Sequence, residues 1–267
     1  MKLETLQKSK MYLRAVHAET SIAALRQLIR DNPLGVLTTS IPSATYPLIQ
    51  STHIPWVLDV DDESNEEDLG RLRGHLARAN PQSKAMIDSI KSRTSDTSAS
   101  FLEQEVLVLF TSQVHHYVTP KFYVETKPTT GKVVGTWNYA AVQAYGRAKI
   151  YFDHTSEESS SFLMKQLEEL SDQSDRRIMG YTGTDGKPSP WKISEAPEKY
   201  IELLRKAIIG IEIEIDRLEG KAKMSQELAQ GDRDGVLEGF RAMDSDLGHA
   251  VANMVEERTP IKVNGSS

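Results

Sequence analysis

The chain has 267 residues, and its content of 39% hydrophobic and 26% charged residues is ordinary for a soluble globular protein. The formal net charge of −6 argues against a surface that grips nucleic acid over its whole extent, so we do not expect a nucleic-acid partner. Cysteine is absent, which excludes disulfide bonds, thiolate zinc sites and cysteine nucleophiles.

Segments that would direct the chain to a membrane are not visible in the sequence. Residues 1–20 lack the apolar stretch of a signal peptide, and no run approaches the roughly 18 apolar residues of a membrane span. We therefore expect a cytoplasmic protein without a membrane partner.

The first half of the chain alternates between helical and extended patterns. Apolar residues recur at helical spacing in residues 19–31, and "NPLG" ends that pattern. Residues 35–41 and 46–60 are rich in β-branched residues and predict two strands. The acidic segment 59–68 predicts a solvated loop, residues 69–78 a third strand, and "PQSKAMIDSI" a short helix that begins with a proline.

The second half contains the most strongly patterned segments. "EVLVLFT" predicts a buried strand, and "WNYAAVQAYGRAKIYF" predicts one long strand or two short ones. A Ser-x-x-Glu-like cap opens a helix over residues 156–173, and "APEKYIELLRKA" predicts another. Isoleucine alternates with acidic residues in "IIGIEIEIDRLEG", which predicts a strand, and the remainder after residue 222 has a polar, helical pattern.

The order of these elements shows no regular strand–helix–strand repeat. Several antiparallel strands with helices outside them predict a closed or partly closed β-barrel of the α+β class. We expect one domain over residues 1–245, including a C-terminal helical extension, and a partly disordered tail over residues 246–267.

Polar residues lie within or at the ends of three predicted strands, in "QSTHIP", "GHLARANP" and "GTWNYAAVQAYG". Inside a barrel such groups need partners, and an anionic, planar ligand rich in hydrogen-bonding atoms would supply them. Basic side chains suit a phosphate, hydroxyls and amides suit a ribityl chain, and an indole suits stacking. The alternative is that these residues are exposed strand ends. They are Ser51, Thr52, His53, His75, Arg78, Asn80, Trp137 and Asn138.

The histidines do not form a recognisable metal motif. No H-E-x-x-H is present, and His115 and His116 would point to opposite faces of a strand. We therefore expect no metal site. A G-x-S-x-G elbow and a P-loop are also absent from the sequence.

Collinear segments over most of the chain resemble one known family. From about Met11 to Met243 they are "MYLRAVH", "NPLGVLTTS", "STHIPWVL", "LRGHLARANPQ", "VLVLFTSQVHHYVTPKFY", "VGTWNYAAVQAYGRAKI", "IIGIEIEIDRLEGKAKMSQ" and "GDRDGVLEGF". In these segments the chain resembles the PaiB-like family of FMN-binding negative transcriptional regulators, which shares the FMN-binding split barrel of pyridoxamine phosphate oxidases.

The resemblance implies an antiparallel split barrel paired as a homodimer, with FMN at the subunit interface. It implies that FMN contacts Ser51, Thr52, His53, His75, Arg78, Asn80, Pro81, Trp137 and Asn138. We further expect Lys223, Ser225 and Gln226 beside the flavin, as a lid or a partner-subunit contact. The alternative for this last segment is a helix N-terminal turn in which Ser225 caps the helix and Lys223 is solvated.

The chain departs from the family pattern at several positions. Phe122 stands where a tryptophan usually precedes the tyrosine, Ser83 replaces a common aromatic, and Glu227 replaces the asparagine of a Lys-x-Ser-Gln-Asn motif. Loop insertions over residues 59–68 and 92–100 lengthen the chain. We expect the flavin site to survive these changes and whatever binds next to the flavin to differ.

Three functions are compatible with the resemblance. We favour an FMN-dependent oxidoreductase that acts on an unidentified small or planar substrate. The alternatives are a non-catalytic FMN-binding transcriptional regulator and a haem-binding or haem-degrading split barrel, with His115, His116 or His249 as axial ligand. The sequence contains no helix-turn-helix and no basic stripe, which argues against the regulator. No residue is an obvious acid or base, so the catalytic residues remain unassigned.

Overall fold

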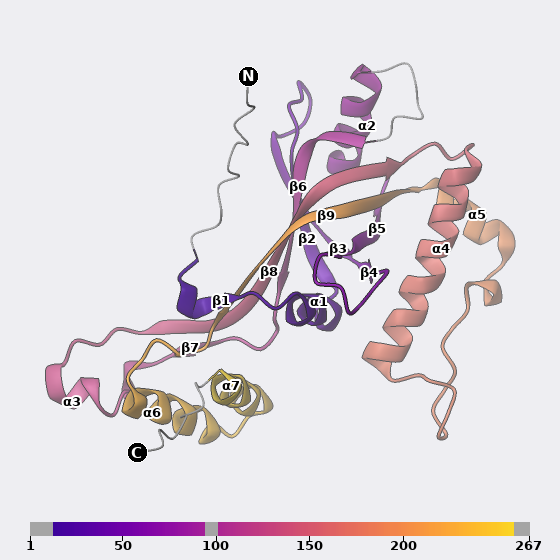
Figure 1. The fold of residues 1–267 in the computed structure, drawn as a ribbon. Coiled ribbons are helices and arrows are strands. Elements are labelled where there is room, and N and C mark those ends of the chain that lie inside the picture. The colour runs from indigo at the N-terminus through magenta and orange to yellow at the C-terminus, as the bar shows by residue number, and fades with distance from the viewer. Residues whose placement is uncertain (1–12, 94–100, 259–267) are drawn as a thin grey trace. The chain divides into compact units, whose positions relative to one another are not determined.

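The computed structural model describes residues 13–93 and 101–258 (Figure 1). The chain divides into two compact units, each built from segments that are distant in sequence. The terminal unit comprises Met1–Thr20, Thr111–Val142 and Glu219–Ser267, and the barrel unit comprises Ser21–Phe110 and Gln143–Leu218. The single domain expected over residues 1–245 is therefore divided between two units in the structure.

Antiparallel strands organise the barrel unit. They are β2 (Leu34–Ser40), β3 (Ile49–Pro55), β4 (Val57–Asp59), β5 (Arg71–Ala77), β6 (Phe101–Thr111), and parts of β8 (Thr136–Tyr151) and β9 (Ile208–Lys223). Their order within a nine-stranded sheet is β3-β2-β6-β8-β9-β5-β4. Because β3 also contacts β5, the path of six strands from β3 to β5 closes on itself. The predicted antiparallel barrel with outer helices is confirmed.

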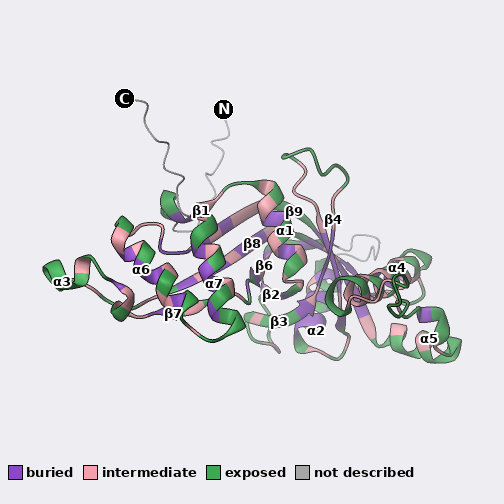
Figure 2. Cartoon of the chain, turned by 90° about the horizontal axis from the view of Figure 1, so that it is seen from below, coloured by how far each residue is buried: buried purple, intermediate pink, exposed green. Residues whose placement is uncertain are grey.

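Alternation along the strands directs apolar side chains into the core of this unit. Buried positions of the chain are purple in Figure 2. On β9, Ile211 and Ile213 are buried, whereas Glu214 and Asp216 are exposed. Burying one such isoleucine stabilises the fold by roughly 1.5–3 kcal/mol relative to leaving it exposed. Packing is tight where β5 meets β3, because a Cβ atom at Gly74 would lie only 2.9 Å from a side-chain carbon of Ile54.

The helices of the barrel unit begin at residues that suit helix starts. Ser156 accepts the Ser159 N–H at 3.4 Å as the predicted cap of its helix, and a proline begins the helix at residue 81. The helical segments are α1 (Ile22–Asp31), α2 (Pro81–Arg93), α4 (Glu157–Ser174), the π-helical turn η3 (Asp175–Met179), the 3₁₀ turn η4 (Ile193–Glu195) and α5 (Glu198–Lys206). Among them, α1 and α4 contact β4, and α2 contacts β3.

The acidic loop between β4 and β5 is exposed, as predicted, yet it is ordered around a buried arginine. The side chain of Arg26 on α1 is only 1% exposed. Its guanidinium donates hydrogen bonds to the carbonyl oxygens of Glu63, Asn65 and Asp68. The charge pattern of the loop does not indicate this contact, because the arginine comes from a helix earlier in the chain.

The terminal unit combines short strands with helices. It contains η1 (Ala15–His17), β1 (Ala18–Glu19), β7 (His116–Val118), η2 (Pro120–Phe122), α3 (Thr126–Thr130), α6 (Gln230–Arg241) and α7 (Asp246–Glu257), with the first residues of β8 and the last of β9. β1 pairs antiparallel with β9, and β7 pairs with β8. The side chains of Phe122 and Phe240 meet edge to face, with ring centroids 5.4 Å apart.

Residues 246–257 form a packed helix where the sequence predicted the start of a tail. Ser245 caps α7 by accepting the Gly248 N–H at 3.1 Å. Val251, Ala252 and Val255 recur at helical spacing and are buried. This apolar face is the reason that the segment folds against α6. The rest of the expected tail, residues 259–267, lies outside the described residues.

Candidate functional site

Strand β3 presents two of the candidate side chains to solvent. Ser51 and His53 are exposed, whereas Thr52 between them is half-buried, because successive side chains of a strand point to opposite faces. Ser51 lies opposite Thr38 of β2, and their hydroxyl oxygens are 2.9 Å apart. The outer surface of the β2–β3 hairpin therefore carries two hydroxyls and an imidazole.

Asn80 and Pro81 begin α2, and Asn80 links this helix to β3. The Oδ1 atom of Asn80 accepts the Gln82 N–H at 2.8 Å, and its Nδ2 atom donates to Thr52 Oγ1 at 3.3 Å. Pro81 occupies the first helical position, where a missing N–H costs nothing. The structure thus brings Thr52, Asn80 and Pro81 together.

His75 on β5 has a buried ring nitrogen. Its Nδ1 atom has no hydrogen-bond partner among the described residues. Burial lowers the pKa of the imidazole below its usual value of 6.5, because desolvation disfavours the charged form. A neutral imidazole with an unused nitrogen can exchange one hydrogen bond with a ligand, but it does not offer the positive charge expected of a basic phosphate contact.

Arg78 follows β5 and is bound to the backbone. Its guanidinium donates to the carbonyl oxygens of Phe152 at 2.6 Å, Lys206 at 3.2 Å and Ile208 at 3.4 Å. Its own N–H donates to the carbonyl oxygen of Ala207 at 2.8 Å. In the structure Arg78 joins the end of β5 to the end of β8 and the start of β9, and a phosphate contact would be an additional role.

The two candidates on β8 belong to the terminal unit and differ in exposure. Trp137 is 54% exposed, and its ring lies edge-on to Tyr117 with centroids 6.1 Å apart. Asn138 is completely buried, and its Oδ1 atom accepts from Ser225 Oγ at 3.1 Å. The Nδ2 atom of Asn138 has no partner within the described part of the chain. This residue pair therefore offers an exposed aromatic surface and an unused buried donor.

The Lys-x-Ser-Gln segment forms a turn at the end of β9. Lys223 Nζ donates to Thr136 Oγ1 at 2.5 Å and to the Trp137 carbonyl oxygen at 3.2 Å. Gln226 closes the turn, because its side-chain amide donates to the carbonyl oxygen of Ala222 at 2.6 Å. Lys223 is consequently bonded to β8 and is not simply solvated.

The alternative of a helix N-terminal turn at this segment is wrong. The next helix, α6, begins at Gln230 with Ala229 as its N-cap. Ser225 is 1% exposed, has a positive φ of 63°, and donates to Asn138 instead of capping a helix. The proposed position beside a flavin remains a prediction.

Two further polar residues meet at this turn. Glu227 Oε2 lies 3.1 Å from His17 Nε2, and Glu227 Oε1 lies 3.7 Å from Lys223 Nζ. Burial raises the pKa of Glu227, but a backbone N–H, His17 and Lys223 together lower that pKa below its usual value. The sequence marked Glu227 only as a departure from a motif. His17 reaches it through the pairing of β1 with β9, in which Ala18 lies opposite Lys221, and no local pattern predicts that pairing.

The described residues show neither a cluster of metal ligands nor a membrane-spanning helix. Within residues 13–93 and 101–258, no three His, Cys, Asp or Glu side chains are grouped as metal ligands would be. Over the same ranges, no helix combines the length and the apolar character that crossing a bilayer requires.

Comparison with known protein families identifies the chain. The sequence profile described as "Putative FMN-binding domain" matches residues 11–217. The chain belongs to this family. FMN is the cofactor that the family description names, and all candidate residues except Lys223, Ser225 and Gln226 lie inside the matched region. The predicted membership of an FMN-binding family is confirmed.

Relatives of the chain include fungal and bacterial proteins. An uncharacterized protein of Emericella nidulans is 59% identical over 254 residues, covering 94% of this chain and 99% of the relative. The "Protease synthase and sporulation protein PAI 2" of Bacillus subtilis is 23% identical over 248 residues, covering 93% and 98%. A solved FAD- and haem-binding protein from Mycobacterium smegmatis matches with a TM-score of 0.43 and 15% identity, covering 78% of this chain and 73% of that one.

Proposed function

We propose that this chain binds FMN and uses it in an oxidoreductase reaction on a small or planar molecule. The observation that carries the proposal is the family match over residues 11–217, which includes the candidate residues on β3, β5, α2 and β8. FMN would supply the electron-transfer chemistry, while the protein supplies binding, orientation and exclusion of water.

The hydrogen-bonding groups of the barrel unit fit such a cofactor. Ser51 and His53 face outward beside the Thr38 hydroxyl, and His75 has a ring nitrogen without a partner among the described residues. Hydroxyls and imidazoles of this kind can bond to the phosphate oxygens and ribityl hydroxyls of FMN. We assign direct contact with the cofactor to Ser51, His53 and His75.

The remaining candidates have supporting or separate roles in this proposal. Thr52, Asn80 and Pro81 fix the start of α2 against β3, and a helix N-terminus favours a phosphate. Arg78 already donates to three carbonyl oxygens, so it holds the backbone around the site.

In the terminal unit, the indole of Trp137 would suit stacking on a flavin ring. Asn138, Lys223, Ser225 and Gln226 stay candidates for polar contacts there.

Titration of the purified chain with FMN tests the binding proposal. We expect about one FMN per chain and flavin absorption bands at about 370 and 450 nm. Substitution His53→Ala should weaken FMN binding about tenfold, because a hydrogen bond to the cofactor is lost. His154→Ala is the matched control, since His154 is also exposed in the barrel unit and has no assigned role. Absence of FMN binding, or equal effects of the two substitutions, contradicts the proposal.

The oxidoreductase part needs a kinetic measurement. After anaerobic reduction of the bound FMN, planar acceptors such as quinones should reoxidise it faster than they reoxidise free FMN. Equal reoxidation rates for bound and free FMN would favour the non-catalytic regulator. A Soret band at about 400 nm in place of the flavin bands would favour the haem alternative.

We also propose that the chain forms a homodimer with FMN at the subunit interface, as the family resemblance implies. Leu48 and Ile49 are 53% and 65% exposed at the beginning of β3, which is one end of the strand order. Exposed apolar residues at a terminal strand favour association with a second copy.

A further inference from the structure

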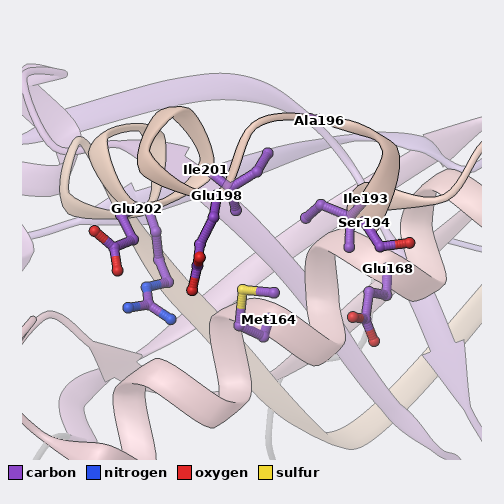
Figure 3. Close-up of a pocket in the computed structure, with 9 residues that line it drawn as sticks. Met164, Glu168, Ile193, Ser194, Ala196, Glu198, Ile201 and Glu202 are labelled. Carbon is purple, nitrogen blue, oxygen red and sulfur yellow. The ribbon is translucent and has the colours of Figure 1, made fainter.

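A pocket that is separate from the candidate flavin residues lies between two helices of the barrel unit. It has a volume of about 390 Å³ and is bounded by α4, η4 and α5 (Figure 3). This volume falls within the range of about 300–1,000 Å³ that is usual for small-molecule sites. None of its lining residues is among the candidates for FMN. We propose that this pocket binds a small organic cation with an apolar body.

The apolar part of the pocket comes from each of its three elements. Met164 of α4, Ile193 of η4 and Ile201 of α5 line it. Figure 3 shows Met164 on the α4 side of the pocket and Ile201 and Ile193 on the opposite side. Ile193 is only 9% exposed, and Met164 and Ile201 are half-buried, so the apolar side chains lie deeper than the exposed glutamates of the lining. A bare inorganic ion would gain nothing from these side chains, whereas an alkyl or aryl group would.

The charged residues of the pocket give it a negative balance. Glu168 lies on α4, Glu198 and Glu202 lie on α5, and Arg205 is the only cation of the lining. None of these four groups has a hydrogen bond or ion pair from its side chain within the described part of the chain. Three carboxylates against one guanidinium leave a net negative lining, which favours a cationic ligand and disfavours an anionic one.

The arrangement on α5 strengthens this inference. Glu198 and Glu202 are four residues apart, so both carboxylates project from the same face of the helix, and like charges at this spacing repel each other. Both line the pocket, and Figure 3 shows the Glu198 side chain extending from α5 toward Met164. Arg205 lies on the same face, three residues after Glu202, and offsets part of this repulsion. A cationic ligand would offset the remaining negative charge while its apolar part contacts Met164 and Ile201.

A smaller pocket beside the first one adds an aromatic side chain to this region. It has a volume of about 280 Å³ and shares Glu168, Ile193 and Ser194 with the first pocket. Its far side includes Trp191, whose side chain is 43% exposed. Glu168 and Asp172 outnumber Lys192 in this lining, which leaves it negative by one charge. An aromatic face in such a lining suits an organic ammonium, because cations are attracted to the indole ring. The acids do not form a group of metal ligands in the described residues, which further favours an organic cation over a metal ion.

The connection that precedes η4 has an unusual length. Residues 180–192, between η3 and η4, contain neither helix nor strand. Structureless connections of this length are uncommon within compact domains and often carry function. Here the connection leads directly into Ser194 and Ile193 of the pocket.

Calorimetric titration with 2-phenylethylammonium tests the proposal, with 2-phenylethanol as the uncharged analogue of similar shape. Both titrations use the full chain at neutral pH, with and without saturating FMN. We expect the ammonium compound to bind at least about tenfold more tightly than the alcohol, since only the cation gains charge-assisted contacts. Binding should be the same with and without FMN, which separates this site from the proposed flavin site.

Substitutions then locate the site. Glu198→Gln and Glu202→Gln should each weaken binding of the ammonium compound several-fold, and the double substitution should make it equal to that of the alcohol. Glu66→Gln is the matched control, because it removes the same charge from an exposed position in the barrel unit outside the pocket. Glu198 and Glu202 are exposed, so the variants should remain folded, which thermal melting verifies. Three results would overturn the proposal. They are no binding of the ammonium compound up to about 10 mM, equal affinity for the ammonium compound and the alcohol, or equal effects of all three substitutions.

Discussion

Two arginines on β5 differ mainly in burial. Arg71 pairs with Asp61, and Arg73 pairs with Asp59 and also with Glu169. The side chain of Arg73 is 3% exposed, whereas that of Arg71 is 41% exposed. Hydrogen bonds to both acids raise the pKa of Arg73 although its burial opposes this, so the guanidinium stays charged inside the fold. Removing one partner of a buried pair is costly because the remaining charge is poorly hydrated.

We therefore predict a large difference between matched substitutions at these positions. Arg73→Met should lower the free energy of unfolding by about 2–4 kcal/mol. The loss stays moderate because the side chains of Asp59 and Glu169 are 26% and 44% exposed and can partly rehydrate. Arg71→Met should cost only about 0–1 kcal/mol, as is usual for surface pairs. Urea unfolding measures both values, and equal losses would show that burial is not the deciding factor.

Asp68 makes the stability of the acidic loop depend on pH. Its carboxylate accepts the N–H groups of Asp62 at 3.0 Å, Asp61 at 2.8 Å and Gly70 at 3.0 Å. The bond from the Asp62 N–H, followed by those from Asp61 and Gly70, lowers the pKa of Asp68 below its usual value of 3.8. Because the pKa is lower in the folded state, the contribution to stability is complete above the unfolded pKa and disappears as the pH falls through the folded pKa.

The predicted outcome is a pH-dependent gap between the wild type and Asp68→Asn. The gap in unfolding free energy should be constant near neutral pH and should shrink below pH 3.8, the usual pKa of the carboxyl group. Glu66→Gln provides the control, since Glu66 is an exposed acid of the same loop and the structure assigns it no hydrogen bond. Unfolding curves recorded from pH 7 to about pH 2 measure the gap. If the difference in unfolding free energy stays unchanged at the lowest pH, the hydrogen bonds of Asp68 do not depend on the charge of its carboxylate.

For single residues, the sequence predicts which chemical groups are present more successfully than it predicts which groups bond to each other. Arg78 has the chemistry of a phosphate contact, but its actual partners are carbonyl oxygens from β8 and the start of β9. His17 and Glu227 show the same limit, because only the register of β1 on β9 brings them together. Partners of this kind depend on tertiary structure, so a local pattern cannot identify them.

Helices and strands could be predicted wherever a short stretch of sequence marks them. Ser156 and Pro81 mark the beginnings of α4 and α2, and the alternation of isoleucine with acids marks β9. The sequence could not show that β8 passes from one unit into the other, because its alternation is continuous over 16 residues. The expected start of the tail at residue 246 was too early, because Val251, Ala252 and Val255 recur at helical spacing and mark α7.

The start of α2 allows a stabilising role to be separated from a role in cofactor binding. Asn80→Ala should lower the free energy of unfolding by about 1 kcal/mol, because the Gln82 N–H loses its acceptor. Asn80→Asp should keep the cap and the stability, yet weaken FMN binding, because a carboxylate near the helix start would repel the phosphate. Ser156→Ala is the matched control, as it removes the cap of α4 and should leave FMN affinity unchanged. Melting temperature and FMN titration measure the two effects, and an unchanged FMN affinity in Asn80→Asp would exclude Asn80 from the cofactor site.

At the scale of the whole molecule, composition could not reveal two units. Each unit is assembled from segments that alternate along the chain, so no boundary in charge or hydrophobicity separates them. The family match, by contrast, runs through both units without interruption from residue 11 to residue 217. Family membership therefore says more about the cofactor than about how the chain is divided.

The last prediction concerns assembly. If two copies associate through the exposed end of β3, the mass measured by light scattering at micromolar concentration should be twice that of the chain. Ile49→Glu should shift the mass toward the monomer, because a charge buried in an apolar interface is left unpaired. Leu203→Glu introduces the same charge at a residue of α5 that is 67% exposed, and it should leave the mass unchanged. A monomeric wild type with FMN present would contradict the proposed dimer, and a dimer insensitive to Ile49→Glu would place the interface on another surface.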